Sequence, residues 1–596
     1  MNIHNKSHRR PPAPQPGAPL EFARSPGAGL ARCGAQGGYT LLVVLFFASI
    51  SLLVLGSALK WSMTNSHLND RNNQYFSTAA AAEAATEKVL ANVSRDFQAQ
   101  GESLVWANVS SYRLLTPTTA ESSTWSGFTF SDVAGTTNRM YVERLAASAY
   151  VPLQSQYQGI YGLASTYRVI SNARMNGLPY DISTGVKQEV QLASIPIFQF
   201  AIFYSMDLEI NPGPNMTITG RVHGNNNINL QPVSTLTFQS HVTAAGAIIQ
   251  NKHTNDPSVR SLGSSQVIYQ AEHDANTSAL TLPVGTNNSP DAVQAIVEIP
   301  PSSEDPASPM GKQRFYNKAD LVVLVSNTTV TVKSGLFNNF ASTVTSGEWN
   351  QWLKTNVTFY NQREGKTIKT SELDVDKLRI WSASNTNLWP ALGGRDVRSL
   401  YVADMRSQTG STESGVRLKN GQTLPPLGLT VASPNPLYVQ GHYNAPAFHL
   451  GTTNTSSTKP AALIGDSINL LSTAWNDGNG AAALSSRIAG DTTVNAAFMG
   501  GIVPSNGTSY SGGVENFPRF LEDWTSRTLA YNGSMVVMFY SKTSTNSWGG
   551  SGVYSPPIRQ WTFDLNFLDV TKLPPCTPEV RALIRGQWAQ IRPGTT

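Results

Sequence analysis

The sequence predicts a mainly β protein of the α+β class, with a long N-terminal helix, a small α/β head and a β-solenoid interrupted by an insertion. Three observations lead to this prediction. They are an uncharged N-terminal run that continues into a helix-forming stretch, a composition rich in turn residues, and a repeat with a 20-residue period. The chain has 596 residues, which suggests about three or four domains.

The composition is typical of a turn-rich extracytoplasmic β protein. Charged residues make up 14% of the chain, against roughly a quarter in ordinary globular proteins. Glycine occurs 47 times and proline 35 times, and serine, threonine and asparagine are abundant. Short strands separated by turns are therefore expected over most of the length.

The positive charge is concentrated in residues 1–38, which carry +4 of the formal net charge of +5. We therefore expect no nucleic-acid partner, since a nucleic-acid surface needs its basic residues on the folded body. Cys33 and Cys576 are the two cysteines, too few for a disulfide framework or a multi-cysteine zinc site. No catalytic, metal or cofactor site is expected from the motifs present.

A membrane-spanning helix is predicted directly after this basic segment. The 21 residues from Tyr39 to Leu59 carry no charge, and Lys60 ends the run. At 1.5 Å per residue they extend about 31 Å, enough to cross the hydrocarbon of a bilayer. The basic segment precedes the run, so residues 1–38 are expected in the cytoplasm and the remainder outside. The prediction is a single-pass membrane anchor.

The helix is predicted to continue to residue 100, because no proline falls between Pro26 and Pro117 and no glycine between Gly56 and Gly101. The alanine-rich stretch 79–85 has very high helix propensity. Residues at helical spacing form one face that needs a packing partner: Leu68, Tyr75, Ala79, Ala82, Val89, Val93 and Phe97. The simpler alternative is a signal anchor with a helical stalk.

The start of this helix resembles a known family. Gly37-Gly38-Tyr39-Thr40-Leu41-Leu42 follows a basic leader and is similar to the class III signal of type IV pilins. The stretch 79–85 resembles the alanine-rich segment of PilX-type minor pilins. The resemblance implies that a prepilin peptidase cleaves after Gly38, that Tyr39 becomes a methylated N-terminus, and that the helix packs in a filament core. Implied partners are other pilins or pseudopilins, the peptidase and an inner-membrane assembly platform.

Two features depart from the family pattern. Pilins usually carry glutamate at the fifth mature position, where Val43 stands here, and the leader of 38 residues is long. In the family this glutamate pairs with the terminal amine of a neighbouring subunit, and its absence is typical of tip subunits. The resemblance therefore implies a subunit at the filament tip. It also implies that the protein lies first in the inner membrane and then at the cell surface or in the pilus.

Residues 101–204 are expected to form the α/β head. The segment 167–171 alternates as a strand, and 186–204 is a longer β-prone run.

A β-solenoid is predicted from two adjacent copies of one pattern. Residues 208–227 align without gaps on residues 228–247, and their apolar positions coincide. Such coils bury their inner side chains only against one another. The first part of the solenoid is assigned to residues 205–260.

A third copy, 429–443, reproduces the spacing, with Leu429 aligned on Leu208, and implies one solenoid that resumes after an insertion. The inserted region is assigned to 261–425, with 321–325 as a buried strand and 328–333 as its hairpin partner. The second part is assigned to 426–550, with further coils in 461–471, 493–503 and 534–540. Residues 551–596 are expected to cap the fold with a short helix that opens at Thr577-Pro578-Glu579.

Few residues suggest chemistry. Arg221, His241 and His442 are expected at one coil position, as an outward ladder. Acidic candidates for a polysaccharide-active enzyme are Asp207, Glu209, Asp374, Asp376 and Asp466, but paired-carboxylate chemistry needs two of them about 5–10 Å apart. Four tryptophans lie close together in the inserted region and are expected either to fill a core or to bind a glycan: Trp349, Trp352, Trp381 and Trp389.

The function predicted is therefore a non-enzymatic, PilX-like minor pilin whose solenoid body adheres to a surface ligand or caps the filament. The alternatives are a membrane-anchored solenoid enzyme acting on polysaccharide and a pseudopilus component of a secretion system.

Overall fold

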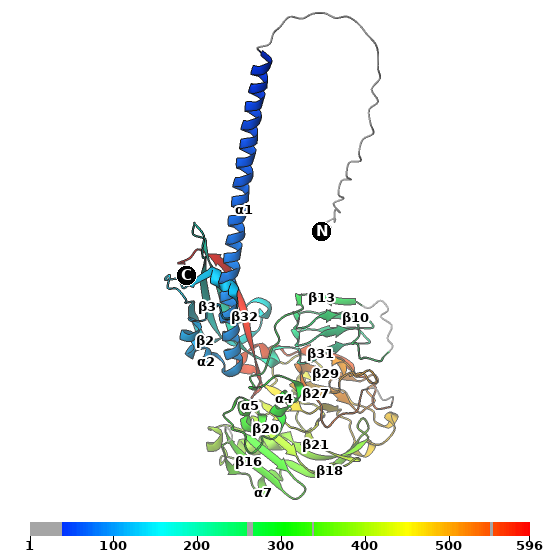
Figure 1. The fold of residues 1–596 in the computed structure, drawn as a ribbon. Helices are drawn as coiled ribbons and strands as arrows, with labels where there is room; N and C mark the ends of the chain where they lie inside the picture. Colours follow the sequence, from blue (N-terminus) through cyan, green and yellow to red (C-terminus); the bar gives the residue numbers. More distant parts are fainter. Residues whose placement is uncertain (1–38, 259–265, 337–338, 549–551, 596) are drawn as a thin grey trace, which may run out of the picture. The chain divides into compact units, whose positions relative to one another are not determined.

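The structure is a computed structural model that describes residues 39–258, 266–336, 339–548 and 552–595 (Figure 1). The described residues divide into two units, one up to residue 73 and the other from residue 74 onward. The predicted fold class is confirmed, because a long apolar N-terminal helix is followed by a mostly β body. The leader, including Gly38, lies outside the described residues.

The first helix has the bounds that the sequence predicts. α1 (Tyr39–Gln100) is one 62-residue helix, and its residues up to 73 belong to the first unit. It ends at Gly101, whose φ of 82° lies in the left-handed region that favours glycine. Two short helices follow, α2 (Glu102–Ala107) and α3 (Val109–Tyr112).

The head is a five-stranded antiparallel sheet covered on one face by the second half of α1. Its spatial order is β1-β3-β4-β32. β2 pairs with residues 161–170 of β3, on the same edge where β1 pairs with residues 172–175. The strands are β1 (Phe128–Ser131), β2 (Tyr141–Pro152), β3 (Tyr161–Met175), β4 (Ser183–Pro196) and β32 (Glu579–Ile591). The predicted strands 167–171 and 186–204 fall within or near β3 and β4.

The short C-terminal helix predicted at Thr577-Pro578-Glu579 is wrong, because these residues lead into β32, which pairs with β4 over most of its length. The physical reason is burial on both faces. Val580 and Ile584 enter the core of the body, whereas Leu583 packs against the core under α1. The cap and proline are local helix signals, and sheet pairing between two cores outweighs them.

The body is built around one 12-stranded sheet. Its order is β14-β11-β8-β5-β30-β27-β24-β22-β20-β15-β16-β17, with every pair from β14 to β15 parallel. The strands are β5 (Ile202–Tyr204), β8 (Val222–Gly224), β11 (Val242–Ala244), β14 (His273–Asp274), β15 (Leu321–Val325), β16 (Val330–Leu336), β17 (Asn339–Thr343), β20 (Ser399–Asp404), β22 (Leu429–Ala432), β24 (Ala461–Gly465), β27 (Ala497–Ile502) and β30 (Met535–Tyr540).

Further sheets complete the coils. One pair of sheets has the orders β12-β9-β6 and β18-β19-β21-β23-β25-β28; another has β13-β10-β7 and β26-β29-β31. Their strands are β6 (Leu208–Ile210), β7 (Met216–Ile218), β9 (Ile228–Leu230), β10 (Thr235–Phe238), β12 (Ile248–Ile249), β13 (Gln266–Tyr269), β18 (Leu353–Asn361), β19 (Lys366–Asp374), β21 (Thr412–Lys419), β23 (Leu437–Gln440), β25 (Ile468–Leu471), β26 (Thr492–Asn495), β28 (Arg519–Phe520), β29 (Thr528–Gly533) and β31 (Ile558–Phe563).

The two predicted copies stack in register. Leu208 pairs with Ile228, Met216 with Leu236, and Val222 with Val242, as the alignment predicts. Side chains at the turns strengthen the stack. The side-chain oxygens of Asp207, Asn211, Asn215 and Asn227 each accept a hydrogen bond, 2.9–3.1 Å long, from the backbone N–H 20 residues later. These bonds satisfy turn amides that would otherwise lack partners.

The coils do not follow the chain in one direction through an interruption. Along the stack, the strands from β15 to β30 come first in sequence order, and the strands from β5 to β14 follow them. Coils from the later half of the chain therefore precede coils from the earlier half. The seam lies where Met535 pairs with Ile202 and Val537 with Tyr204. Figure 1 shows β10 and β13 at one end of the body, and β16 and β20 at the other. The simple interrupted order predicted from the sequence is therefore corrected.

The third copy is also placed differently from its prediction. Leu429 lies in β22 of the 12-stranded sheet, which also contains Val222, whereas Leu208 lies in β6 of another sheet. Its alignment is wrong by one strand of the coil. In both copies, a corner separates two short apolar strands by the same number of residues. The spacing therefore does not show which sheet of the coil each strand joins.

The inserted region contributes to the stack as well as to helices. β15 and β16 form the predicted hairpin, and β20 and β21 pair in parallel with β22 and β23. The short helices are α4 (Pro290–Gln294), α5 (Pro309–Gln313), α6 (Phe315–Lys318), α7 (Ser346–Trp349) and α8 (Val375–Ser384).

Candidate functional site

The predicted processing site is described on one side only. Tyr39 is the first residue of α1 and its side chain is 77% exposed, whereas Gly38 lies outside the described residues. Tyr39, the first described residue, is helical.

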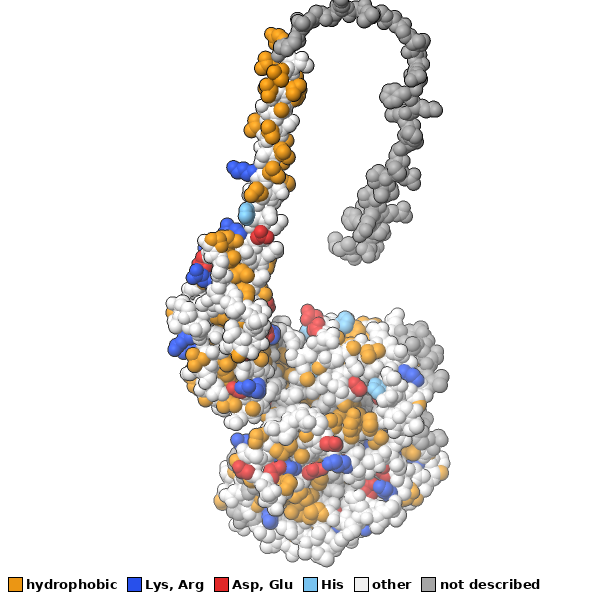
Figure 2. Space-filling view, in the orientation of Figure 1, with side chains coloured by type: hydrophobic (Ala, Val, Ile, Leu, Met, Phe, Trp, Pro, Cys, Tyr) orange, Lys and Arg blue, Asp and Glu red, His pale blue; other side chains and the backbone are white. Residues whose placement is uncertain are grey.

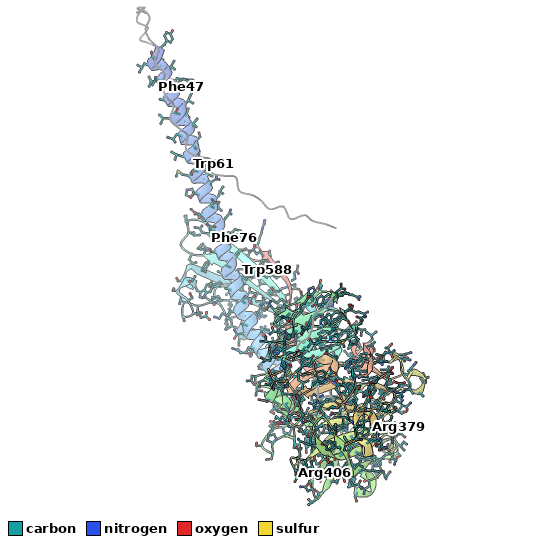
Figure 3. All side chains as sticks on the ribbon, turned by 90° about the vertical axis from the view of Figure 1, so that its right-hand side faces the viewer. Phe47, Trp61, Phe76, Arg379, Arg406 and Trp588 are labelled. Atoms are coloured by element: carbon teal, nitrogen blue, oxygen red, sulfur yellow. The ribbon has the colours of Figure 1, made fainter. Side chains whose placement is uncertain are left out.

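The first unit presents an apolar helical surface. The helix is long and apolar enough to cross a membrane. Large side chains such as Leu42, Phe47 and Leu53 are exposed, and Val43 is exposed among them. Figure 2 shows hydrophobic side chains along this part of the helix, and Figure 3 shows Phe47 and Trp61 projecting from it.

The predicted packing face is divided between exposed and buried residues. Leu68 and Tyr75 are exposed. The other members of the face are buried: Ala79, Ala82, Val89, Val93 and Phe97. All of these except Ala79 belong to the core of the head, together with β3 and β4 residues such as Val169 and Val190. The packing partner of this buried part is therefore the head of the same chain.

A buried carboxylate ties α1 to the helices that follow it. Asp96 Oδ2 accepts hydrogen bonds from the Tyr112 hydroxyl at 2.7 Å and from Asn108 Nδ2 at 2.9 Å. Burial opposes ionisation of Asp96, but these bonds and one from Arg95 outweigh it and lower the pKa of Asp96. Burial and the neighbouring Asp96 raise the pKa of Tyr112.

The C-terminal end of α1 is held by Arg581 of β32. Its Nη1 donates to the carbonyl oxygens of Phe97 and Gln98, both at 2.8 Å. A cation near a helix C-terminus also interacts favourably with the helix dipole. A Cβ on Gly101 would lie 3.1 Å from Arg581 Nη2, so glycine leaves room for the guanidinium. Sequence reasoning missed this contact, because it assigned residues 577–579 to a helix.

A second arginine of β32 contacts α1 at the surface. Arg585 Nη2 donates to Glu87 Oε2 at 2.7 Å, and Nη1 pairs with Oε1. The hydrogen bond and charge of Arg585 lower the pKa of Glu87, against a smaller opposing effect of burial. Such exposed pairs contribute little stability individually.

Arg221 joins the head to the coils. It is buried, and it donates to the carbonyl oxygens of Gln156 and Gln158, both at 2.6 Å. Burial lowers the pKa of Arg221 to about 10. The predicted outward ladder is therefore wrong at this residue, because the head covers it. The His241 carbonyl accepts from the Val222 amide on the neighbouring coil, whereas the His442 ring accepts from the amide of Thr493 in β26.

The acidic candidates are engaged separately. Glu209 accepts from Ser505 and Ser511, and Asp466 accepts from the amides of residues 542–544. Asp207 accepts from the Asn227 amide, and Asp376 pairs with Arg379. Within the described ranges, no group of three or more His, Cys, Asp or Glu side chains could hold a metal ion.

The four tryptophans of the inserted region are mostly interior. Trp352 and Trp381 are buried and their rings lie 5.4 Å apart, and Trp349 and Trp389 are half-buried.

No protein-family model matches the chain, and neither does any curated protein sequence. Among solved structures, it is similar to the competence-associated pilin ComZ from Thermus thermophilus. The TM-score is 0.30 and the sequence identity 11%, over 87% of this chain and 97% of that one. A TM-score this low does not establish a shared fold.

Proposed function

We propose that this protein is a non-enzymatic, PilX-like minor pilin subunit of a type IV pilus or a related filament, such as a secretion pseudopilus. The observation that carries the proposal is the junction at Gly38-Tyr39, where a basic leader meets the uncharged start of a single helix. Support also comes from the second half of α1, which forms the core of an antiparallel head.

The proposed assembly uses α1 in two stages. Residues 39–59 anchor the subunit in the inner membrane after cleavage by a prepilin peptidase, and then pack against other pilins in the filament. Leu68 and Tyr75 extend this packing surface, since both are exposed. Ala79, Ala82, Val89, Val93 and Phe97 hold the head on the helix that enters the filament.

We place the subunit at the filament tip. Val43 lacks the carboxylate by which the family pairs with a neighbouring N-terminus, and residues 101–596 form a body too bulky for repeated helical packing. The coil body then adheres to a surface ligand or caps the filament.

Cleavage tests the proposal directly. Gly38→Ala is expected to leave the protein uncleaved in the membrane, because the peptidase of this family requires the glycine before the cut. Intact-mass measurement of membrane fractions from the host detects the retained leader. Gly37→Ala is the matched control and should be cleaved normally. Normal cleavage of Gly38→Ala would contradict the proposal.

A further inference from the structure

A small polar pocket lies on the body among β18, β19, α8 and β21. It has a volume of about 220 Å³. Pockets for drug-sized ligands usually measure about 300–1,000 Å³, so this one suits a smaller group, such as one sugar ring. Figure 3 labels Arg379, which marks the position of α8.

Three lysines line this pocket from three different elements. They are Lys354 of β18, Lys377 of α8 and Lys419 of β21, out of 16 lysines in the chain. Among the residues that the structure describes, Lys354 and Lys419 form no ion pair within 4 Å. Lys377 has a long contact of 3.9 Å with Asp374. Unpaired ammonium groups at one pocket favour an anionic ligand.

Two carboxylates line the same pocket, which limits the charge of that ligand. Glu372 accepts from Arg417 at 2.8 Å, and Asp374 accepts from Asn420 at 2.9 Å. Each carboxylate has further lone pairs that can accept from hydroxyl groups. A phosphate, with about −1.5 to −2 charge at neutral pH, is repelled by them more strongly than a carboxylate. The donor and acceptor set therefore matches a monoanion with several hydroxyl groups.

Trp352 forms an apolar part of the pocket wall. Its side chain is 1% exposed and lines the pocket. Packing against Trp381, at 5.4 Å between ring centres, holds the ring in place.

We propose that this pocket binds one uronic-acid residue of an acidic polysaccharide. The lysines contact the sugar carboxylate, and the carboxylates and amides contact its hydroxyl groups. This deepens the adhesive role proposed above and rests on it for the biological meaning of the binding.

The test uses the full chain purified in detergent, with trigalacturonate as the probe and neutral maltotriose as the control ligand. Calorimetry should show saturable binding of trigalacturonate that weakens with salt, and no binding of maltotriose. The double variant Lys354→Ala/Lys419→Ala should bind at least tenfold more weakly. Lys369→Ala is the matched control, because Lys369 lies on β19 and contacts the Ser407 carbonyl outside the pocket.

Four outcomes would overturn the proposal: no binding of trigalacturonate, equal binding of maltotriose, unchanged affinity in the double variant, or equally tight binding of inorganic phosphate. Thermal unfolding of each variant shows whether it is folded. The mass of the N-terminal peptide in the same preparation reports on cleavage. A chain that starts at Tyr39 and fails to bind would reject the pocket and leave the filament proposal standing.

Discussion

At the scale of single residues, Asp96 connects ionisation to the stability of the head. Its side chain is buried and accepts hydrogen bonds from Tyr112 and Asn108, and its pKa lies below the ordinary value. A lowered folded-state pKa stabilises the fold above the unfolded pKa of about 3.9. That contribution is lost as the pH falls through the folded pKa. Acid should therefore loosen the contact between α1 and α3.

Asp96→Asn should destabilise the head at neutral pH by about 1–3 kcal/mol, because the charged acceptor of two hydrogen bonds is lost. The variant should also lose less stability than the wild type when the pH falls below about 4. Denaturant unfolding at several pH values measures both effects. An identical pH dependence in the two proteins would contradict the role given to Asp96.

Arg581→Ala should free the last turn of α1, because the Gln98 carbonyl loses the guanidinium donor and the Phe97 carbonyl keeps only the Gly101 amide. Hydrogen bonds from charged donors contribute about 1.5–3 kcal/mol each, so amide exchange near residue 100 should rise by one to two orders of magnitude. Arg581→Lys should restore part of the protection. Exchange mass spectrometry gives the comparison, and unchanged protection in Arg581→Ala would exclude a capping role.

At the scale of elements, β32 determines how head and body are joined. It is the last strand in the sequence, yet it completes a sheet whose other strands lie in residues 128–196. One of its faces belongs to the core of the body, and the other packs under α1. The head therefore cannot complete its sheet until the C-terminal strand has folded back.

Val580→Asp should prevent the docking of β32, since it places a charge at a fully buried position in the core of the body. Limited proteolysis is expected to cut the variant near residue 579 and leave the coils intact. Gln590→Asp, an exposed change on the same strand, is the control and should resist cleavage. Equal resistance in the two variants would contradict the strand assignment.

The elements that the sequence predicts well are those whose pattern is local. The C-terminal end of α1 follows from the absence of glycine between Gly56 and Gly101 and of proline before Pro117, and the stacking of 208–227 on 228–247 follows from alternation at a fixed period. The strand β32 and the phase of the copy at 429–443 depend on pairing between distant segments. Short apolar strands look alike on every face of a coil, so spacing alone does not assign them.

The candidate site was predicted in the same uneven way. The exposed apolar face of residues 39–59 is evident from composition. The burial of Val89, Val93 and Phe97 in the head was not, because a helical stripe does not identify its partner. The contacts of Arg221, which was predicted to point outward, and of Arg581 gave no signal in the sequence, since their acceptors are backbone carbonyls that the fold brings close.

At the scale of the whole molecule, the coils form one stack whose later half in sequence comes first in space. The same winding direction in both halves allows β30 and β5 to pair in parallel at the seam. The first strand of the coils therefore lies inside the stack, next to the head, and both ends of the stack come from the middle of the chain. β32 pairs with β4, the strand that precedes β5 in the sequence, so the head sheet is connected to the seam strand by a short segment.

The central claim is that the mature protein is a processed filament subunit. It is tested most directly by N-terminal sequencing and intact-mass measurement of the protein purified from its own host membrane. We predict a chain that starts at Tyr39, with a methyl group on the terminal amine. A chain that starts within residues 1–38 would contradict the claim and make residues 39–59 a plain membrane anchor.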